Sequence, residues 1–401
     1  MNQRQDQHKL LIFNAQVHQA ILKIVEIFLP LEISARDLDD KMLWEILCHA
    51  SVEQGYIESS CRVLNDAPSG NTVRAHLIEA LGDGDQALEQ LEEQLNQAMQ
   101  AQLPQRVRRK LLSRACEAAG DWVDIPYHGQ DGAENKNVRP NQPRAGTTRF
   151  HAYATLSVIS KGKRVTLAMT LVHKGEKMDQ IVKRLMAWAR KLGARFKCTY
   201  WDKAFGVVNV MRYLRACRVP YVIALAKQGV RRLCVGRSSR MVRYTFNARK
   251  EPYTTDVVIA CHYAGRASKR RPKKKKKGVR YYAYAVYGVG KRSVQAISAA
   301  YHRRFAIESG YRQLHQVRAR TRSRHTGLRL LLIGLALLLV NLYVLVRARW
   351  AIVTRYGSRI YRRAVTLSEV ATALLVQIQS LLGFSPEFYC RARGPGSRFI
   401  S

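Results

Sequence analysis

The sequence predicts a mixed α/β fold, with helices on both faces of a sheet, preceded by an all-α N-terminal region. Three observations predict it. Apolar residues recur at helical spacing through residues 10–100. From residue 121 the pattern changes to short apolar runs that are typical of strands. These runs then alternate with helical segments, as in a sheet that is covered by helices.

The N-terminal region, residues 1–104, contains a short predicted helix at 57–64, a turn at 68–70 and a further helix from Asn71. This order is typical of a helix-turn-helix, whose second helix would present Arg74 to a DNA groove. The surrounding residues are acidic, which opposes binding to phosphate, so a purely structural helical bundle is the alternative. We therefore expect either DNA binding or oligomerisation here.

The next region, residues 105–225, opens with a basic helix and continues with the elements of a sheet. A polar loop is expected at 130–148, and a Lys-Gly turn joins the second strand to the third. The predicted strands are 121–127, 150–159, 164–172, 194–202 and 219–225, and the predicted helices are 105–114, 178–192 and 205–217.

Residues 226–296 form a β-rich insertion, with strands expected at 231–236, 241–246, 254–263 and 281–289. The insertion contains a basic block that cannot pack in a core and that includes Lys273, Lys274, Lys275, Lys276 and Lys277. Such a block is a solvated loop, and it is also able to bind phosphate groups regardless of DNA sequence. We therefore predict that these lysines contribute to DNA binding.

After the insertion, residues 297–350 are expected to hold a helix that carries Glu308 and a long apolar helix at 328–346, and residues 351–401 form a basic C-terminal tail region. The apolar segment approaches the ~20 residues needed to span a bilayer. Basic clusters flank it on both sides, and Asn341 lies within it. We expect a buried core helix and no membrane partner, with a single-span membrane protein as the alternative.

The charge of the chain points to a polyanionic partner. The 401 residues carry a formal net charge of +39 and a sequence pI of about 10.4, yet residues 1–100 hold 7 Lys/Arg against 16 Asp/Glu. A strongly basic body of this kind favours nucleic acid first and an anionic membrane surface second. The 8 cysteines include no CxxC pair, so we expect reduced thiols, no zinc site and a cytoplasmic, nucleoid-associated protein.

Three carboxylates stand out among the few acids of the basic part: Asp121, Asp202 and Glu308. Gathered in one pocket they would repel each other unless a cation lay between them, and oxygen ligands suit Mg²⁺ or Mn²⁺. Each also has a structural interpretation. Asp202 could cap the helix that follows it, Asp124 could take the role of Asp121, and Glu308 could form helical ion pairs with nearby arginines.

Three motifs carry a family resemblance. The runs DWVDIPYHG, TYWDKAFGVVNVMRYL and YHRRFAIESGYRQ resemble the three catalytic motifs of insertion-sequence DDE transposases. The third has the spacing Tyr, two residues, Arg, three residues, Glu; seven residues after the Glu the family has Lys, whereas this chain has His315. The resemblance implies a ribonuclease-H-like core interrupted by a β-rich insertion.

The resemblance also implies roles for these residues. Asp121, Asp202 and Glu308 would be catalytic and would bind two Mg²⁺ or Mn²⁺ ions. The residues expected to contact DNA near the cut are Tyr301, Arg304, Arg312 and His315.

The function implied is metal-dependent cleavage at the ends of a transposable element and strand transfer into double-stranded target DNA, by a homodimer or larger assembly. The alternatives are a nuclease on the same fold without joining activity, and a non-catalytic basic nucleic-acid-binding protein.

Overall fold

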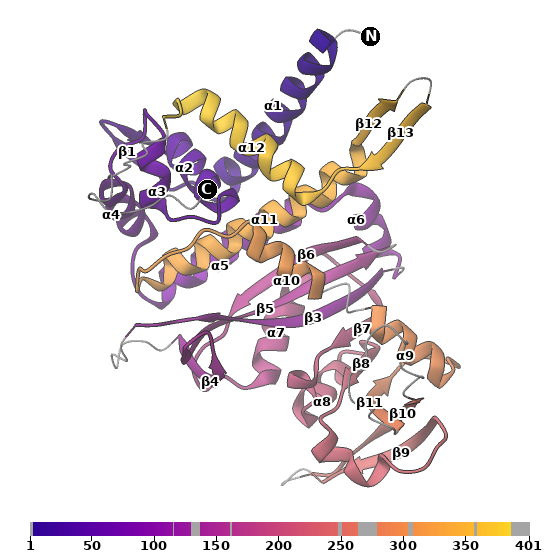
Figure 1. The fold of residues 1–401 in the computed structure, drawn as a ribbon. Helices are drawn as coiled ribbons and strands as arrows, with labels where there is room; N and C mark the ends of the chain where they lie inside the picture. The colour runs from indigo at the N-terminus through magenta and orange to yellow at the C-terminus, as the bar shows by residue number, and fades with distance from the viewer. Residues whose placement is uncertain are drawn as a thin grey trace, which may run out of the picture.

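The computed structural model describes residues 3–114, 116–129, 137–160, 163–247, 251–263, 279–303, 308–356 and 359–385. A helical body, built from both ends of the chain, lies against one end of a large mixed sheet, and the strands of the insertion extend the sheet at its other end (Figure 1).

The N-terminal region is almost entirely helical. Two-residue strands, β1 (Ser34–Ala35) and β2 (Leu38–Asp39), interrupt the helices, so the expected all-α region contains a small hairpin. The carboxylate of Asp40 shapes the preceding loop because it accepts three backbone N–H groups, from residues 31–33. The helices are α1 (Gln3–Phe28), α2 (Asp40–Val52), α3 (Ile57–Val63), α4 (Gly70–Leu81), α5 (Asp85–Ala101) and α6 (Gln105–Leu112).

The sheet has nine strands in the order β4-β5-β3-β7-β8-β11-β10-β9, and β6 also pairs with β5. β3, β7 and β8 run parallel to one another, and the remaining neighbours are antiparallel. The strands are β3 (Cys116–Pro126), β4 (Val138–Arg144), β5 (Thr147–Ser160), β6 (Lys163–Leu171), β7 (Phe196–Trp201), β8 (Tyr221–Ala224), β9 (Arg240–Phe246), β10 (Tyr253–Tyr263) and β11 (Val279–Tyr287). The insertion therefore extends the sheet, because β11 pairs with β8.

Two elements of the sheet region differ from expectation. Part of the predicted loop at 130–148 forms β4, whose backbone pairs with β5 although its side chains are mostly polar and exposed. The strand predicted at 231–236 is wrong, because residues 227–233 form the 3₁₀ helix η2 (Lys227–Leu233). η2 buries Val230 and exposes arginines, so its apolar residues do not alternate as a half-buried strand requires.

Helices cover both faces of the sheet. One face carries α7 (Met178–Lys191) and α8 (Val208–Ala216), and the other carries α9 (Val294–Arg303) and α11 (Thr326–Arg349). Of the helix expected to run from Ile297 through Glu308, the structure describes α9 up to Arg303 and α10 (Glu308–Gln316), and residues 304–307 lie outside the described residues. Residues 351–401, expected as a basic tail region, contain β12 (Ala351–Tyr356), β13 (Arg359–Ala364) and α12 (Leu367–Leu382), which packs on α1 and α2.

Within the described residues, α11 is the one helix long and apolar enough to cross a membrane by length and composition. In this structure 89% of its most apolar window is buried, against α5, β6 and helices from both ends of the chain. Its Asn341 is fully buried and bonds to the backbone of Thr166 in β6, accepting from N–H at 2.8 Å and donating to C=O at 3.0 Å. This burial is typical of a core helix.

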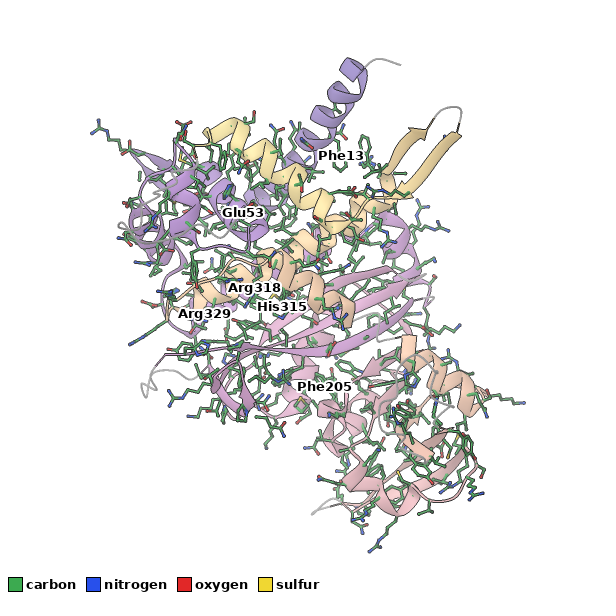
Figure 2. All side chains as sticks on the ribbon, in the orientation of Figure 1. Phe13, Glu53, Phe205, His315, Arg318 and Arg329 are labelled. Atoms are coloured by element: carbon green, nitrogen blue, oxygen red, sulfur yellow. The ribbon has the colours of Figure 1, made fainter. Side chains whose placement is uncertain are left out.

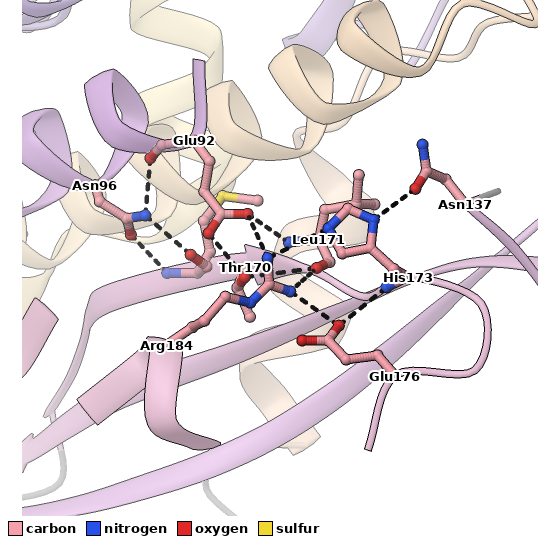
Figure 3. A network of polar contacts seen from close by, with 9 residues as sticks. Glu92, Asn96, Asn137, Thr170, Leu171, His173, Glu176 and Arg184 are labelled. Carbon is pink, nitrogen blue, oxygen red and sulfur yellow. Dashed lines mark hydrogen bonds and ion pairs between the residues drawn. The ribbon is translucent and has the colours of Figure 1, made fainter. Parts of the chain in front are cut away.

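Side chains from α5 and α11 form hydrogen bonds with the outer edge of β6 at Thr166, Met169 and Leu171. Asn96 accepts from the N–H of Met169 at 2.7 Å and donates to its C=O at 2.9 Å, and Asn341 does the same for Thr166. Glu92 accepts from the N–H of Leu171 at 2.9 Å (Figure 3). Unpaired strand edges promote association with other chains, and these side chains occupy backbone groups of this edge from within the molecule.

Candidate active site

Asp121 and Asp202 lie at the same level of the sheet on neighbouring strands. β3 and β7 pair in parallel, and the last residues in register are Gly120 and Trp201. Asp121 is the next residue of β3, and Asp202 is the residue that follows the end of β7. Asp121 lies in the middle of β3, not at the start of a strand as expected, and only 8% of it is exposed. The two residues are 81 positions apart in sequence, and the strand register brings them together.

Gly120 permits this arrangement because the indole of Trp201 lies directly over its backbone. A Cβ built at Gly120 would come within 2.1 Å of the ring, a distance that no side chain tolerates. The indole is itself fixed, because its N–H donates to Oγ1 of Thr199 at 2.9 Å and the ring packs edge-on against Phe205 (labelled in Figure 2). Gly120 and Trp201, the residues that precede the two aspartates, therefore pack against each other across the two strands.

Both aspartates lie on the face of the sheet that α9 covers. Side chains alternate between the two faces of a strand, so Asp121 shares a face with Ala119, and Asp202 shares one with Tyr200. Ala119 and Tyr200 belong to a core cluster that α9 completes. The members of this cluster on α9 are Ile297, Ala300 and Tyr301.

Backbone hydrogen bonds orient both carboxylates. Oδ1 of Asp121 accepts the N–H of Trp122 at 2.9 Å, and Oδ1 of Asp202 accepts the N–H of Lys203 at 2.7 Å. Asp202 is therefore the N-cap of the 3₁₀ helix η1 (Lys203–Phe205), as its structural interpretation required. A cap of this kind leaves further acceptor positions on the carboxylate, so capping and metal binding are compatible.

Asp124 is committed to a different task on the opposite face of β3. Its Oδ1 accepts the indole N–H of Trp122 at 2.6 Å, and its Oδ2 accepts the side-chain N–H of Asn141 at 2.7 Å. The guanidinium of Arg139 lies 4.9 Å from the Trp122 ring centroid. Asp124 thus ties β4 to β3, and the alternation of β3 turns it away from Asp121.

Tyr301 is buried beside the second aspartate, with 4% of its surface exposed. Its hydroxyl donates to the carbonyl of Trp201 at 3.4 Å, and its ring packs on Tyr284 with the centroids 4.7 Å apart. Its side chain therefore reaches the backbone that precedes Asp202. The helix α9 and the end of β7 are fixed to each other at this point.

A polar group that the sequence analysis missed lies on the same face. The hydroxyl of Tyr200 donates to Oε1 of Glu117 at 3.0 Å, and Arg292 lies 3.8 Å from the same oxygen. Burial raises the pKa of Tyr200, so its hydroxyl remains a neutral donor. The strand period places Tyr200, two residues before Asp202, on the face of that aspartate, but Glu117 was missed because it precedes the strand predicted at 121–127.

The other predicted site residues are less completely described. Glu308 is the first residue of α10, but its side chain lies outside the described part of the structure, as do Arg304 and Lys273 to Lys277. Arg312 is exposed on α10. Desolvation and the charge of Arg318 lower the pKa of His315. In the N-terminal region, Arg74 forms an ion pair with Glu58 and donates to Asn71 at 3.0 Å.

The side chains that the structure describes include two of the three expected metal ligands, Asp121 and Asp202. Among the side chains that the structure describes, no group of three or more His, Cys, Asp or Glu is close enough to hold a metal ion. The two described carboxylates offer hard oxygen donors at neighbouring positions, which fits Mg²⁺ or Mn²⁺ and does not suit a softer metal.

Residues 113–342, more than half of the chain, match the family model described as transposase DDE domain. The chain belongs to the DDE transposase family. The match spans Asp121 in β3, Asp202 directly after β7 and Glu308 in α10.

The fold has a solved counterpart in this class. A structure described as a piggyBac transposase synaptic complex with hairpin DNA superimposes with a TM-score of 0.52 at 8% sequence identity. The similarity covers 92% of this chain and 78% of that chain. The similarity shows that this chain and the piggyBac transposase share a mixed α/β fold, which is consistent with a ribonuclease-H-like core. No curated protein sequence matches the chain.

Proposed function

We propose that this DDE transposase cleaves DNA at the ends of a transposable element and joins the freed ends to a target. The observation that carries the proposal is the register of Gly120 with Trp201, which sets Asp121 and Asp202 side by side on the face covered by α9. The family and a net charge of +39 support DNA as the substrate.

Asp121, Asp202 and Glu308 would hold two divalent ions, either Mg²⁺ or Mn²⁺. When bound, such ions supply charge stabilisation to both the attacking and the leaving oxygen at phosphorus. The chain contributes placement. The hydrogen bonds from the N–H groups of Trp122 and Lys203 orient the two aspartates, and Tyr301 holds the backbone before Asp202.

The basic residues near this site would bind the phosphates of double-stranded DNA. Arg312 is exposed on the helix that Glu308 begins, so a guanidinium is available there for a phosphate. We propose the same role for Arg304, His315 and the lysines at 273–277. The similar fold, described as a synaptic complex with hairpin DNA, supports DNA as the partner. We also propose that the chain acts on DNA as a homodimer or larger assembly, in the prokaryotic nucleoid.

Cleavage is tested with supercoiled plasmid and Mg²⁺, comparing the parent with Asp202→Asn. The matched control is Asp179→Asn, which removes a partly buried carboxylate of α7 paired with Lys183 at 3.0 Å. We expect the parent and the control to nick the plasmid, and Asp202→Asn to bind DNA without nicking it. Equal nicking by Asp202→Asn and the parent would refute the proposal.

Joining is tested separately, with linear DNA taken from the sequence that flanks the gene and a supercoiled target. Covalent transfer of a labelled 3′ end to the target is the expected product. Nicking without any transferred label would instead identify a metal-dependent nuclease on the same fold.

A further inference from the structure

A positively charged cavity lies beyond the two aspartates on the same face of the sheet. The segment between α10 and α11 runs past the end of β3 and encloses a cavity of about 240 Å³. Figure 2 shows Arg318 and Arg329, two of its lining residues, together with His315 at the end of α10. The polar residues that line it are His128, Tyr153, Arg318, Arg320, Thr321 and Arg329.

The arginines of this cavity have no acidic partner among the described residues. Arg318 is partly buried, and its Nε is fully buried without a hydrogen-bond partner. Arg329 is also partly buried; its Nε donates to the carbonyl of Ser323 at 2.8 Å, and its guanidinium lies 5.0 Å from the ring centroid of Tyr127. The cavity therefore contains guanidinium groups that the protein does not neutralise.

Such an arrangement costs stability in the protein alone. Burying a charged group without a partner is unfavourable, and like charges beside it add to the cost. Burial lowers the pKa of Arg318, and the charges of Arg329 and Arg320 lower it further, against the opposing influence of Tyr153. The Nε of Arg318 has no hydrogen-bond partner, and an incoming anion would neutralise the guanidinium and accept hydrogen bonds from it.

The position of the cavity relates it to the candidate active site. Ile125 of β3 lines it, and this residue is four positions beyond Asp121 with its side chain on the same face. Four residues of strand span about 13 Å. This corresponds to about four base pairs along B-DNA, whose rise is ~3.4 Å for each.

We propose that this cavity binds a backbone phosphate of the DNA strand, within a few nucleotides of the phosphodiester held at Asp121 and Asp202, with Arg318 as its principal donor. The proposal rests on the proposed function for its ligand. Phosphate fits because a planar guanidinium can donate two parallel hydrogen bonds to it. The site would fix the position of the strand and would be insensitive to base sequence.

The test is the salt dependence of DNA binding, measured by fluorescence anisotropy on a labelled duplex of arbitrary sequence in EDTA. Each phosphate contact contributes about 0.9 to the slope of log K against log salt. We expect Arg318→Met to lower this slope by about one and to weaken binding about 10-fold. The control is Arg195→Met, which removes the same charge from an exposed residue before β7, at the opposite end of that strand from Asp202.

A second measurement separates phosphate binding from a structural role. Because Arg318 is an unpaired charge in the DNA-free protein, we expect Arg318→Met to keep or raise the Tm. Should its Tm fall, Arg320→Met takes its place, since Arg320 is exposed and lines the same cavity. An unchanged slope in Arg318→Met with parental Tm, or in Arg320→Met as the substitute, overturns the proposal.

Inorganic phosphate distinguishes a DNA phosphate from a free anion. If it raises the Tm of the parent but not of Arg318→Met, and the slope on DNA is unchanged, the cavity binds a free anion and the DNA assignment is overturned. Binding in EDTA does not depend on cleavage. A parent that binds DNA with the expected slope but never nicks it would refute the proposed function and leave this site intact.

Discussion

The backbone of Gly120 and the indole of Trp201 are in direct contact across two parallel strands, and each residue immediately precedes an aspartate of the candidate active site. Any side chain at position 120 would displace either the ring or the strand. The spacing of the two carboxylates therefore depends on a residue that has no side chain.

Gly120→Ala is expected to lower the free energy of unfolding by about 1–3 kcal/mol, the usual cost of overpacking a core. Urea denaturation checks this. The matched control is Gly229→Ala, because a Cβ at Gly229 would meet no atom within 4 Å. Trp201→Leu combined with Gly120→Ala should recover part of the loss by making room. Parental stability for Gly120→Ala alone would contradict the observed contact.

Tyr301→Phe should slow cleavage by about 10-fold or less while leaving DNA affinity unchanged, since a small displacement of a catalytic group is costly. The reason is that the hydroxyl holds the carbonyl of Trp201, beside Asp202, and is buried away from the surface. Nicking rates and anisotropy together measure the two effects. Tyr263→Phe is the control, because its hydroxyl donates to the backbone carbonyl of Arg237 in the insertion. Weaker DNA binding by Tyr301→Phe would indicate a direct contact instead.

Asp124→Asn is expected to retain Mg²⁺-dependent nicking, whereas Asp121→Asn should lower the nicking rate by more than about 100-fold. The two residues are three positions apart, but Asp124 is bonded to Trp122 and Asn141 on the other face of β3. Plasmid nicking at equal protein concentration compares them. Loss of activity in Asp124→Asn at parental stability would show that the metal site uses this residue.

His49 should make the protein less stable in acid. It lies between helices, with its ring nitrogens near Ser60 and Gln379, and burial lowers its pKa to about 4. The unfolded chain, with a pKa near 6.5, binds more protons between these values, so stability rises with pH across this window and levels off above it.

The measurement is urea denaturation of the parent and His49→Gln at several pH values. In the parent, His49 should contribute a slope of up to about 1.4 kcal/mol per pH unit to the free energy of unfolding, which is the effect of one proton. The variant should lack this contribution. Above pH 7 the two stabilities should no longer change relative to each other. An identical pH profile for both proteins would mean that His49 has the same pKa in the folded and the unfolded state.

Much of the sheet could be predicted from the sequence because its strands are dense runs of apolar residues. β5 and β6 are apolar runs on either side of a Lys-Gly pair in the sequence, and the apolar run of β7 is followed by an aspartate and then an aromatic residue, so local pattern sufficed. β4 was missed because its strand character comes from pairing with β5 and not from its own polar side chains. The start of β3 was placed late because the small residues Ala118 to Gly120 carry little strand signal.

The candidate site was predictable as residue types but not as a geometry. Nothing in the local sequence shows that Gly120 opposes Trp201, since that is a property of the β3–β7 register. The same limit applies to the cavity at Arg318 and Arg329. A run of arginines after α10 predicts only a basic surface, and their partial burial without acids is visible only in the fold.

The buried amides along β6 have a consequence for synthesis of the chain. Asn96 is in place early, but Asn341 is among the last core residues to leave the ribosome. Until then one margin of the nascent sheet has unfilled donors and acceptors that another polypeptide could occupy. Nearly the whole chain must therefore be made before the molecule is protected against pairing with its neighbours, and after that this edge is no longer available for pairing between two copies.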